Sequence, residues 1–146
     1  KLVLVAPAFR YFYFKEGKVD IKSFNETIKN IPEIFKGNNT EEVISRILKT
    51  PIPTMIEFTK LVNHCQDCVN NIKCPTLTIH GTNDLIVPVE ATNYVYNSIK
   101  SKTNILVNIH KLNHECFVTK KSKEVKETIT TFLKQSPKNK KETIEL

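Results

Sequence analysis

The sequence predicts an α/β fold in which parallel strands alternate with helices. Short apolar runs with the composition of buried strands recur along the 146 residues, and helical patterns separate them. No internal repeat or low-complexity segment interrupts this alternation. Strands that alternate with helices form one parallel sheet with right-handed crossovers, so we expect helices against the faces of such a sheet.

The first element is the run LVLVAP, Leu2 to Pro7, whose branched apolar residues are typical of a strand buried on both faces. We interpret it as a strand rather than a signal peptide, because its apolar core is too short. The aromatic stretch FRYFYF follows, and from Asp20 to Thr50 the pattern becomes helical in short pieces. The apolar residues of these pieces recur at helical spacing: Phe24, Ile28, Ile31, and then Val43, Ile44, Ile47 and Leu48.

The remaining elements alternate regularly. A third helix follows TPIP, carries Phe58, Val62, Cys65 and Val69 on one face, and ends near residues 70–71. A strand from Thr76 to His80 comes next, then a helix that opens at Pro88, with Ala91, Tyr94, Val95 and Ile99 on one face. The next strand is Asn104 to His110, and the last helix carries Val125, Ile129, Phe132 and Leu133. From Ser136 the chain is polar, so we expect residues 136–146 to form a frayed tail.

Composition excludes several functional classes. The net charge is +7, but the lysines are scattered and no nucleic-acid-binding motif accompanies them, so we expect no nucleic-acid partner. No apolar run approaches the roughly 18 residues that a membrane span needs. The four cysteines lack the paired spacing of a structural zinc site, and we expect buried free thiols in a reducing, cytoplasmic protein.

Two polar residues follow neighbouring strands of the predicted sheet. Asp84 lies in the segment IHGTND after one strand, and His114 lies in KLNHE after the next. Reactive groups of an open α/β sheet gather at the carboxyl ends of its strands, so we expect the two side chains to form a hydrogen bond. An aspartate that accepts from the imidazole Nδ1–H would leave Nε2 available as a general base. We expect Gly81 to permit the turn through a positive φ, and we expect His64, His80 and His110 to be structural.

The segment IKCPTLTIHGTNDLIVPVEATNYVYNSI, followed by KLNHECF, resembles the last third of α/β-hydrolase esterases, and most of all bacterial carboxylesterases of the monoacylglycerol-lipase kind. The resemblance covers nearly the whole chain and is strongest from Ile72 to Phe117. It implies that Asp84 is the catalytic acid, that His114 is the base, and that no metal or cofactor takes part. It also implies that residues 1–135 are the C-terminal half of one α/β-hydrolase domain, with residues 8–50 as a small helical cap. Glu115 beside the base departs from the family and is expected to raise its pKa.

The serine nucleophile of this family lies in a G-x-S-x-G elbow, and the chain contains no such motif. Its only glycines are Gly17, Gly37 and Gly81, and no two of them are four residues apart. The resemblance therefore implies a serine carboxylesterase or lipase whose nucleophile lies outside these residues, acting on a small-molecule ester. These 146 residues alone are expected to be inactive. The aromatic residues of the cap favour an apolar substrate.

Two alternatives remain open at this stage: a related serine hydrolase, such as a peptidase or thioesterase, and a non-catalytic module that binds a partner or ligand. In the resembling fold the nucleophile strand pairs beside the strand that Leu2–Val5 would form. We therefore expect this edge to pair with the missing N-terminal half or with a second copy of the chain.

Overall fold

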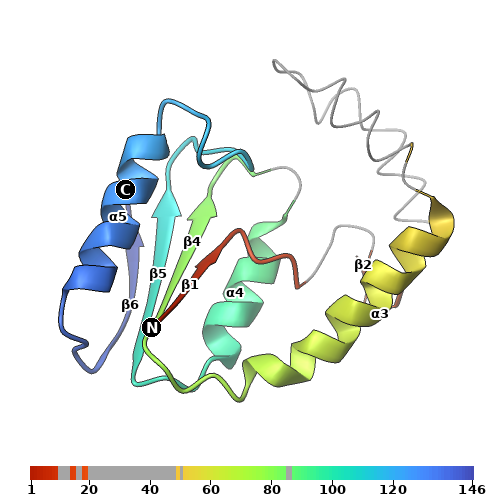
Figure 1. Cartoon of the computed structure of the whole chain (residues 1–146), viewed down its shortest axis with the longest axis horizontal. Helices are drawn as coiled ribbons and strands as arrows, with labels where there is room; N and C mark the ends of the chain where they lie inside the picture. The colour runs from red at the N-terminus through yellow and green to blue at the C-terminus, as the bar shows by residue number, and fades with distance from the viewer. Residues whose placement is uncertain (10–13, 16–17, 20–48, 50, 85–86) are drawn as a thin grey trace.

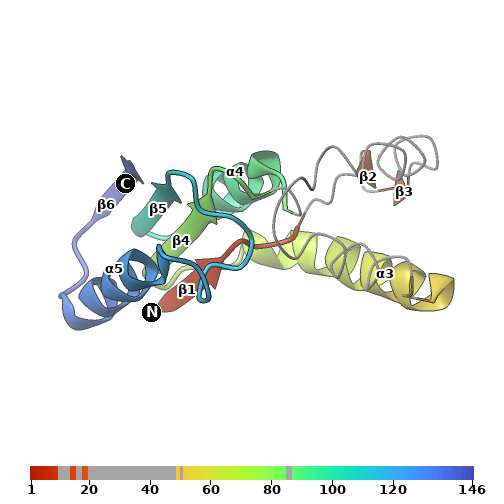
Figure 2. The same ribbon diagram turned by 90° about the horizontal axis from the view of Figure 1, so that it is seen from above.

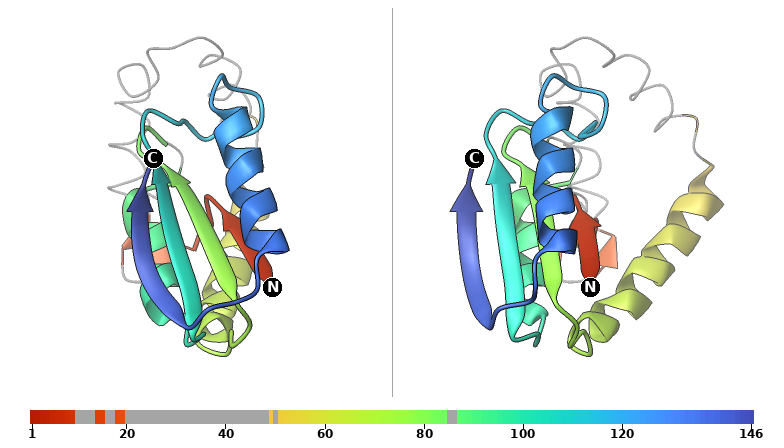
Figure 3. Two further views of the ribbon diagram at one scale, coloured as in Figure 1. Left: turned by 90° about the vertical axis from the view of Figure 1, so that its left-hand side faces the viewer. Right: turned by 60° about the vertical axis from the view of Figure 1, so that its left-hand side comes forward.

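The computed structural model describes residues 1–9, 14–15, 18–19, 49, 51–84 and 87–146. Four parallel strands form the central sheet in the order β1-β4-β5-β6 (Figure 1). They are β1 (Leu2–Val5), β4 (Thr76–Gly81), β5 (Thr103–Ile109) and β6 (Lys140–Glu145). All four strands run in the same direction (Figure 3). The predicted parallel α/β architecture is confirmed.

The strand register places the two loops of interest side by side. β4 pairs with β5 from Thr76 opposite Asn104 to Gly81 opposite Ile109. β4 is buried along its whole length, which explains why its sequence favours branched residues. Because the two strands end level with each other, the loops that follow them leave the same edge of the sheet.

Helices cover both faces of this sheet (Figure 2). α4 (Val89–Ser98) packs on one face together with the C-terminal end of α3 (Ile52–Val69), and α5 (Ser122–Lys134) packs on the other. These are the three helices that the sequence predicted from position 51 onward, and each agrees with the prediction in position. α4 and α5 each carry a glutamate in their first turn, where it interacts favourably with the helix dipole.

The hydrophobic core consists of two clusters, one on each face of the sheet. The larger cluster joins β4 and β5 to α5 and contains Leu77, Ile79, Val107, Ile109, Leu112, Cys116, Val125 and Phe132. The smaller cluster joins α3 and α4 and contains Val69, Val95 and Ile99, with Leu4 and Phe9 packed against it. Phe9, assigned to the cap in the sequence, therefore packs on this cluster.

β1 differs from its prediction in one respect. The sequence indicated a strand buried on both faces, whereas all four of its residues are only half-buried. The reason is its position at the end of the sheet, where within the described residues it pairs with β4 alone. Its apolar composition is that of an interior strand, although among the described strands it has a neighbour on one side only.

The prediction of a frayed tail was wrong. Lys140–Glu145 forms β6, which pairs in parallel with β5 and lies at the opposite end of the sheet from β1. Lys140 N–H donates to Lys102 O and Leu146 N–H donates to Asn108 O, so alternate residues bond to β5. Ile144 packs against the larger cluster. The backbone ladder and one apolar contact order a segment whose sequence is otherwise polar.

Most of the predicted helical cap lies outside the described residues. Within it, β2 (Phe14–Lys15) and β3 (Lys18–Val19) form a short antiparallel pair, which the helical prediction did not include. The helical segments that the sequence predicted between residues 20 and 48 lie outside the described residues. No helix in the described part of the chain is long and apolar enough to span a membrane.

The cysteines are free thiols, as expected, but only one of them is buried. Cys116 lies in the larger cluster, Cys65 is half-buried, and Cys68 and Cys74 are exposed. Cys68 is exposed because it lies away from the face of α3 that Val62 and Val69 bury. Cys74 lies in the turn before β4 rather than inside the strand.

Candidate active site

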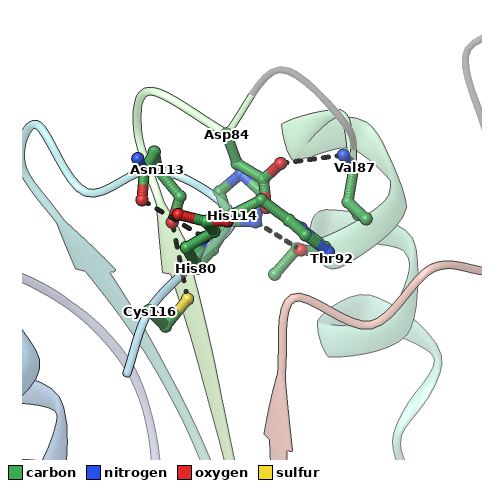
Figure 4. Close-up of polar contacts among 8 residues, drawn as sticks. His80, Asp84, Val87, Thr92, Asn113, His114 and Cys116 are labelled. Carbon is green, nitrogen blue, oxygen red and sulfur yellow. Dashed lines mark hydrogen bonds and ion pairs between the residues drawn. The ribbon is translucent and has the colours of Figure 1, made fainter. Parts of the chain in front are cut away.

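The loops after β4 and β5 bring Asp84 and His114 into direct contact (Figure 4). His114 Nδ1 lies 2.9 Å from Asp84 Oδ2. A carboxylate can only accept, so the proton of this bond resides on Nδ1 and Nε2 is the unprotonated nitrogen of the neutral ring. The hydrogen bond predicted from the sequence is present.

The two side chains differ in exposure. The Asp84 side chain is completely buried, whereas the His114 side chain is 39% exposed. A buried carboxylate needs hydrogen-bond donors in place of water. An exposed imidazole can reach a substrate. In this pair the Asp84 carboxylate, which accepts the hydrogen bond, is shielded from solvent, and the His114 imidazole is accessible.

The loop from β4 to α4 supplies a second donor to Asp84. The backbone N–H of Val87 donates to Oδ1 at 2.9 Å, and the Asp84 N–H donates to Gly81 O at 3.0 Å. One carboxylate oxygen thus binds the backbone and the other binds His114. This division fixes the plane of the carboxylate and directs Oδ2 toward the imidazole.

Gly81 is required for a different reason from the one expected. Its φ does not lie in the left-handed region, so the sequence argument from positive φ was wrong. Instead, a Cβ at this position would lie 2.3 Å from Leu112 O and 2.8 Å from Leu112 C. Only glycine allows the backbones of the two loops to approach so closely. The residue with a positive φ nearby is Lys111, at 58° in the second loop.

Backbone hydrogen bonds hold the two loops together at this point of approach. Asn83 N–H donates to Leu112 O at 3.0 Å, and Thr82 N–H donates to Ile109 O at 3.1 Å. The Thr82 hydroxyl accepts from Lys111 N–H at 3.0 Å. These bonds connect the segment before Asp84 to the segment before His114, so the two side chains are positioned as a unit.

Asp84 determines the protonation chemistry of His114. Its hydrogen bond is the largest influence and raises the pKa of His114 above the ordinary value; burial opposes this effect, and the charges of Asp84 and Glu115 add to it. Glu115 thus acts in the direction that the sequence suggested, but its effect is smaller than that of Asp84. The Glu115 N–H bonds to Asn113 Oδ1, which forms a tight turn around His114.

Two further groups lie close to the pair. His80 is buried on β4, and its Nδ1 lies 2.9 Å from the hydroxyl oxygen of Thr92 in α4. Burial lowers the pKa of His80, whereas the charges of Asp84 and Glu90 act to raise it. Cys116 is buried in the larger hydrophobic cluster, and burial and the charge of Asp84 raise the pKa of its thiol. His64 and His110 are exposed and lie outside this group.

Sequence reasoning named His80 as structural, which its buried hydrogen bond to Thr92 agrees with, but it missed Val87, Thr92 and Leu112. Val87 and Leu112 contribute backbone atoms, which no side-chain motif can reveal. For Thr92 a signal existed, because a threonine between Ala91 and Val95 on the buried side of a helix needs a hydrogen-bond partner.

A groove of about 610 Å³ lies elsewhere, between α5 and the strands β5 and β6. Its floor includes Ile105, Val107 and Ile144, and it contains neither Asp84 nor His114. Within the part of the chain that the structure describes, no three His, Cys, Asp or Glu side chains gather as metal ligands would.

Comparison with known proteins gives two findings. The model of the family described as serine aminopeptidase, S33, matches residues 26–121, a span that includes both Asp84 and His114. Among solved structures, the chain is similar to the crystal structure of the esterase RhEst1 from Rhodococcus sp. ECU1013, with 20% identity and a TM-score of 0.42. That match covers 89% of this chain and 46% of the esterase, so the chain spans less than half of its length. No curated protein matches the chain.

Proposed function

Because this chain belongs to the α/β-hydrolase family described as serine aminopeptidase, S33, we propose that it contributes the acid and base of a serine hydrolase that cleaves carboxylic esters. The observation that carries the proposal is the 2.9 Å hydrogen bond between a buried carboxylate and an accessible imidazole. In this proposal His114 is the general base and Asp84 orients it. The nucleophilic serine lies outside these residues.

The reaction follows from the geometry of the pair. His114 Nε2 takes the proton of the serine hydroxyl as the serine oxygen attacks the ester carbonyl. The imidazolium that forms carries protons on both nitrogens, and Asp84 stabilises it through Nδ1. His114 then gives the Nε2 proton to the leaving alkoxide, which departs as the alcohol. Water then gives a proton to His114 Nε2 as it attacks the acyl-enzyme carbonyl, and His114 returns that proton to the serine oxygen as the carboxylic acid leaves.

The free edge of β1 supports a nucleophile contributed from outside. β1 has the composition of an interior strand but pairs, among the described residues, only with β4. A further strand beside β1 would complete its hydrogen bonding and would end at the same edge of the sheet as Asp84 and His114. We propose that the strand preceding the serine occupies this position; pairing with a second copy of the chain is the alternative. On this proposal residues 1–135, together with β6, form the C-terminal half of the domain, with residues 8–50 as its cap.

Apolar surface beside the base favours an ester with an apolar acyl or alcohol group. Phe117 is 51% exposed and Val118 is 81% exposed, and both follow His114 in the same loop. Large exposed hydrophobic residues next to a catalytic group are suited to contact with an apolar substrate. We propose a carboxylesterase of the monoacylglycerol-lipase kind on this basis.

The description of the family supports a second candidate. A serine aminopeptidase uses the same acid and base but releases an amine instead of an alcohol. An amine is a poorer leaving group and must be protonated as it departs, which places a greater demand on His114. A non-catalytic binding module is the remaining alternative. The free thiols of the described residues support a reducing compartment such as the cytoplasm.

Kinetics on the full-length protein separates these candidates. We expect hydrolysis of p-nitrophenyl esters of medium chain length and little release from amino-acid p-nitroanilides. His114→Ala should abolish turnover, whereas His110→Ala, which removes an exposed histidine four residues earlier, should retain it. Faster cleavage of the anilides would favour the aminopeptidase. Absence of turnover on both substrate classes in the folded protein would favour the binding module.

A further inference from the structure

A buried polar pair lies directly behind Asp84. His80 is the next-to-last residue of β4 and Thr92 is the fourth residue of α4, and their exposed fractions are 1% and 0%. His80 Nδ1 and Thr92 Oγ1 are 2.9 Å apart. Among the described residues, neither side chain makes another hydrogen bond. This bond joins the end of β4 to the beginning of α4.

The pair is not explained by packing alone. A valine has nearly the shape of threonine and would fill the position of Thr92 without burying a hydroxyl. Thr78 provides an internal comparison, because it lies two residues before His80 on the same strand and is also fully buried. Its hydroxyl has no hydrogen-bond partner in the described residues, whereas that of Thr92 is paired.

A short route connects this pair to the acid. The loop that carries Asp84 starts at the end of β4 and finishes at Val87, just before Pro88 caps α4. Val87 N–H donates to Asp84 Oδ1 at 2.9 Å. The distance between these atoms depends on where α4 begins relative to the end of β4, and the hydrogen bond between His80 and Thr92 joins these two elements. Both oxygens belong to one planar carboxylate, so a rotation that moves Oδ1 away from Val87 N–H also moves Oδ2 relative to His114.

We propose that His80 and Thr92 are positioning residues, whose hydrogen bond holds α4 against β4 and thereby sets the orientation of Asp84 toward His114. The claim that this supports catalysis rests on the proposed hydrolase function. The claim that it sets the Asp84–His114 geometry does not.

The charge state of His80 suits this role. The ionisable groups that act on it are Asp84 in the first loop, Glu90 on α4 and His114 in the second loop. Burial lowers the pKa of His80, so the ring is neutral near pH 7. A neutral His80 does not compete with His114 for the negative charge of Asp84, and it does not repel the imidazolium that forms on His114.

The test compares Thr92→Val with Thr78→Val in the full-length protein. Both changes remove one buried hydroxyl with little change of shape, but only the first breaks a hydrogen bond. We expect Thr92→Val to lower the pKa of His114 toward its ordinary value, as measured by NMR titration of histidine-labelled protein. We expect kcat to fall about tenfold or more while KM is unchanged, since small displacements of a catalytic group reduce the rate strongly. Thr92→Ser, which keeps the hydroxyl, should restore both values, and Thr78→Val should change neither.

Each outcome decides the proposal. An unchanged His114 pKa in Thr92→Val would overturn it, and so would equal shifts in both valine variants, because the effect would then be one of packing. If no substrate is turned over, the titration still decides the positioning role, whereas the hydrolase proposal fails separately. If Thr92→Val does not fold, the NMR chemical shifts of the His80 ring nitrogens in the wild-type protein test the proposal instead. A neutral His80 ring held in one tautomer above pH 7 supports the His80–Thr92 hydrogen bond, and a mixture of the two tautomers contradicts it.

Discussion

The close approach of Gly81 to the backbone of Leu112 predicts the effect of Gly81→Ala. A Cβ at this position would lie 2.3 Å from Leu112 O, whereas real Cβ atoms essentially never approach within 3.0 Å of such an atom. The obstacle is a backbone carbonyl, so no side-chain rotation can relieve it. The two loops must move apart.

The magnitude follows from what that movement disrupts. Forcing an extra carbon into a packed site typically costs about 1–3 kcal/mol. The displaced carbonyl also accepts the hydrogen bond from Asn83 N–H, whose loss adds roughly 1 kcal/mol. We therefore expect the free energy of unfolding to fall by about 2–4 kcal/mol. His114 lies two residues after Leu112, so its distance from Asp84 should increase, and kcat/KM should fall roughly 10- to 100-fold.

Urea denaturation and ester kinetics on the full-length protein measure both effects. Asn83→Ala is the matched control, because Asn83 is exposed in the same loop and only its backbone bonds to Leu112. We expect this control to lie within about 0.5 kcal/mol of the wild type. If Gly81→Ala were as stable and as active as the control, the close approach of the two loops would be refuted.

Three further predictions concern the acid and the two edges of the sheet. Asp84→Asn should lower kcat by roughly 10⁴-fold, the loss typical of a Ser-His-Asp acid changed to its amide. It should also move the acid limb of the kcat/KM–pH profile to lower pH, because Asp84 raises the pKa of His114. An acid limb that stays in place would contradict the role of Asp84 in setting the pKa of His114. The stability that a raised His114 pKa provides is fully present below the unfolded value near 6.5 and is lost as pH rises through the folded value, so the deficit of the variant should be larger at pH 5.5 than at pH 9. Glu142→Pro should lower the melting temperature, because even-numbered residues of β6 bond to β5, and Thr143→Pro, whose N–H faces away, should have little effect; equal effects would contradict the assignment of β6. Amides of Leu2–Val5 that face away from β4 should exchange slowly in the full-length protein and rapidly in a monomer of residues 1–146, and protection in that monomer would contradict the free edge of β1.

Much of the architecture could be predicted because local pattern and tertiary structure agree. Apolar strands and helical spacing located β4, α4, β5 and α5 to within a few residues. The same patterns could not locate β6, whose side chains are polar and whose order comes from the backbone ladder with β5. Nor could they show that β1 pairs with β4 alone within the described residues, because the composition of a strand indicates the environment that suits it and not the neighbours it has.

The contact between Asp84 and His114 was predictable because both residues follow strands that run parallel and end level. The contacts that position this pair could not be predicted from the sequence. The role of Gly81 depends on the position of Leu112, thirty-one residues away, and the donor to Asp84 Oδ1 is a backbone amide. His80 looked structural in the sequence because its partner, Thr92, lies on a helix whose packing no local pattern specifies.

Labelling with a fluorophosphonate probe tests the central claim, that Asp84 and His114 activate a serine contributed from outside these residues. The full-length protein should be labelled on one serine beyond residues 1–146, labelling should be lost in His114→Ala, and it should persist in the matched variant His110→Ala. Residues 1–146 alone should not be labelled. Labelling of His114→Ala at the wild-type rate, or modification of a serine within residues 1–146, would contradict the account.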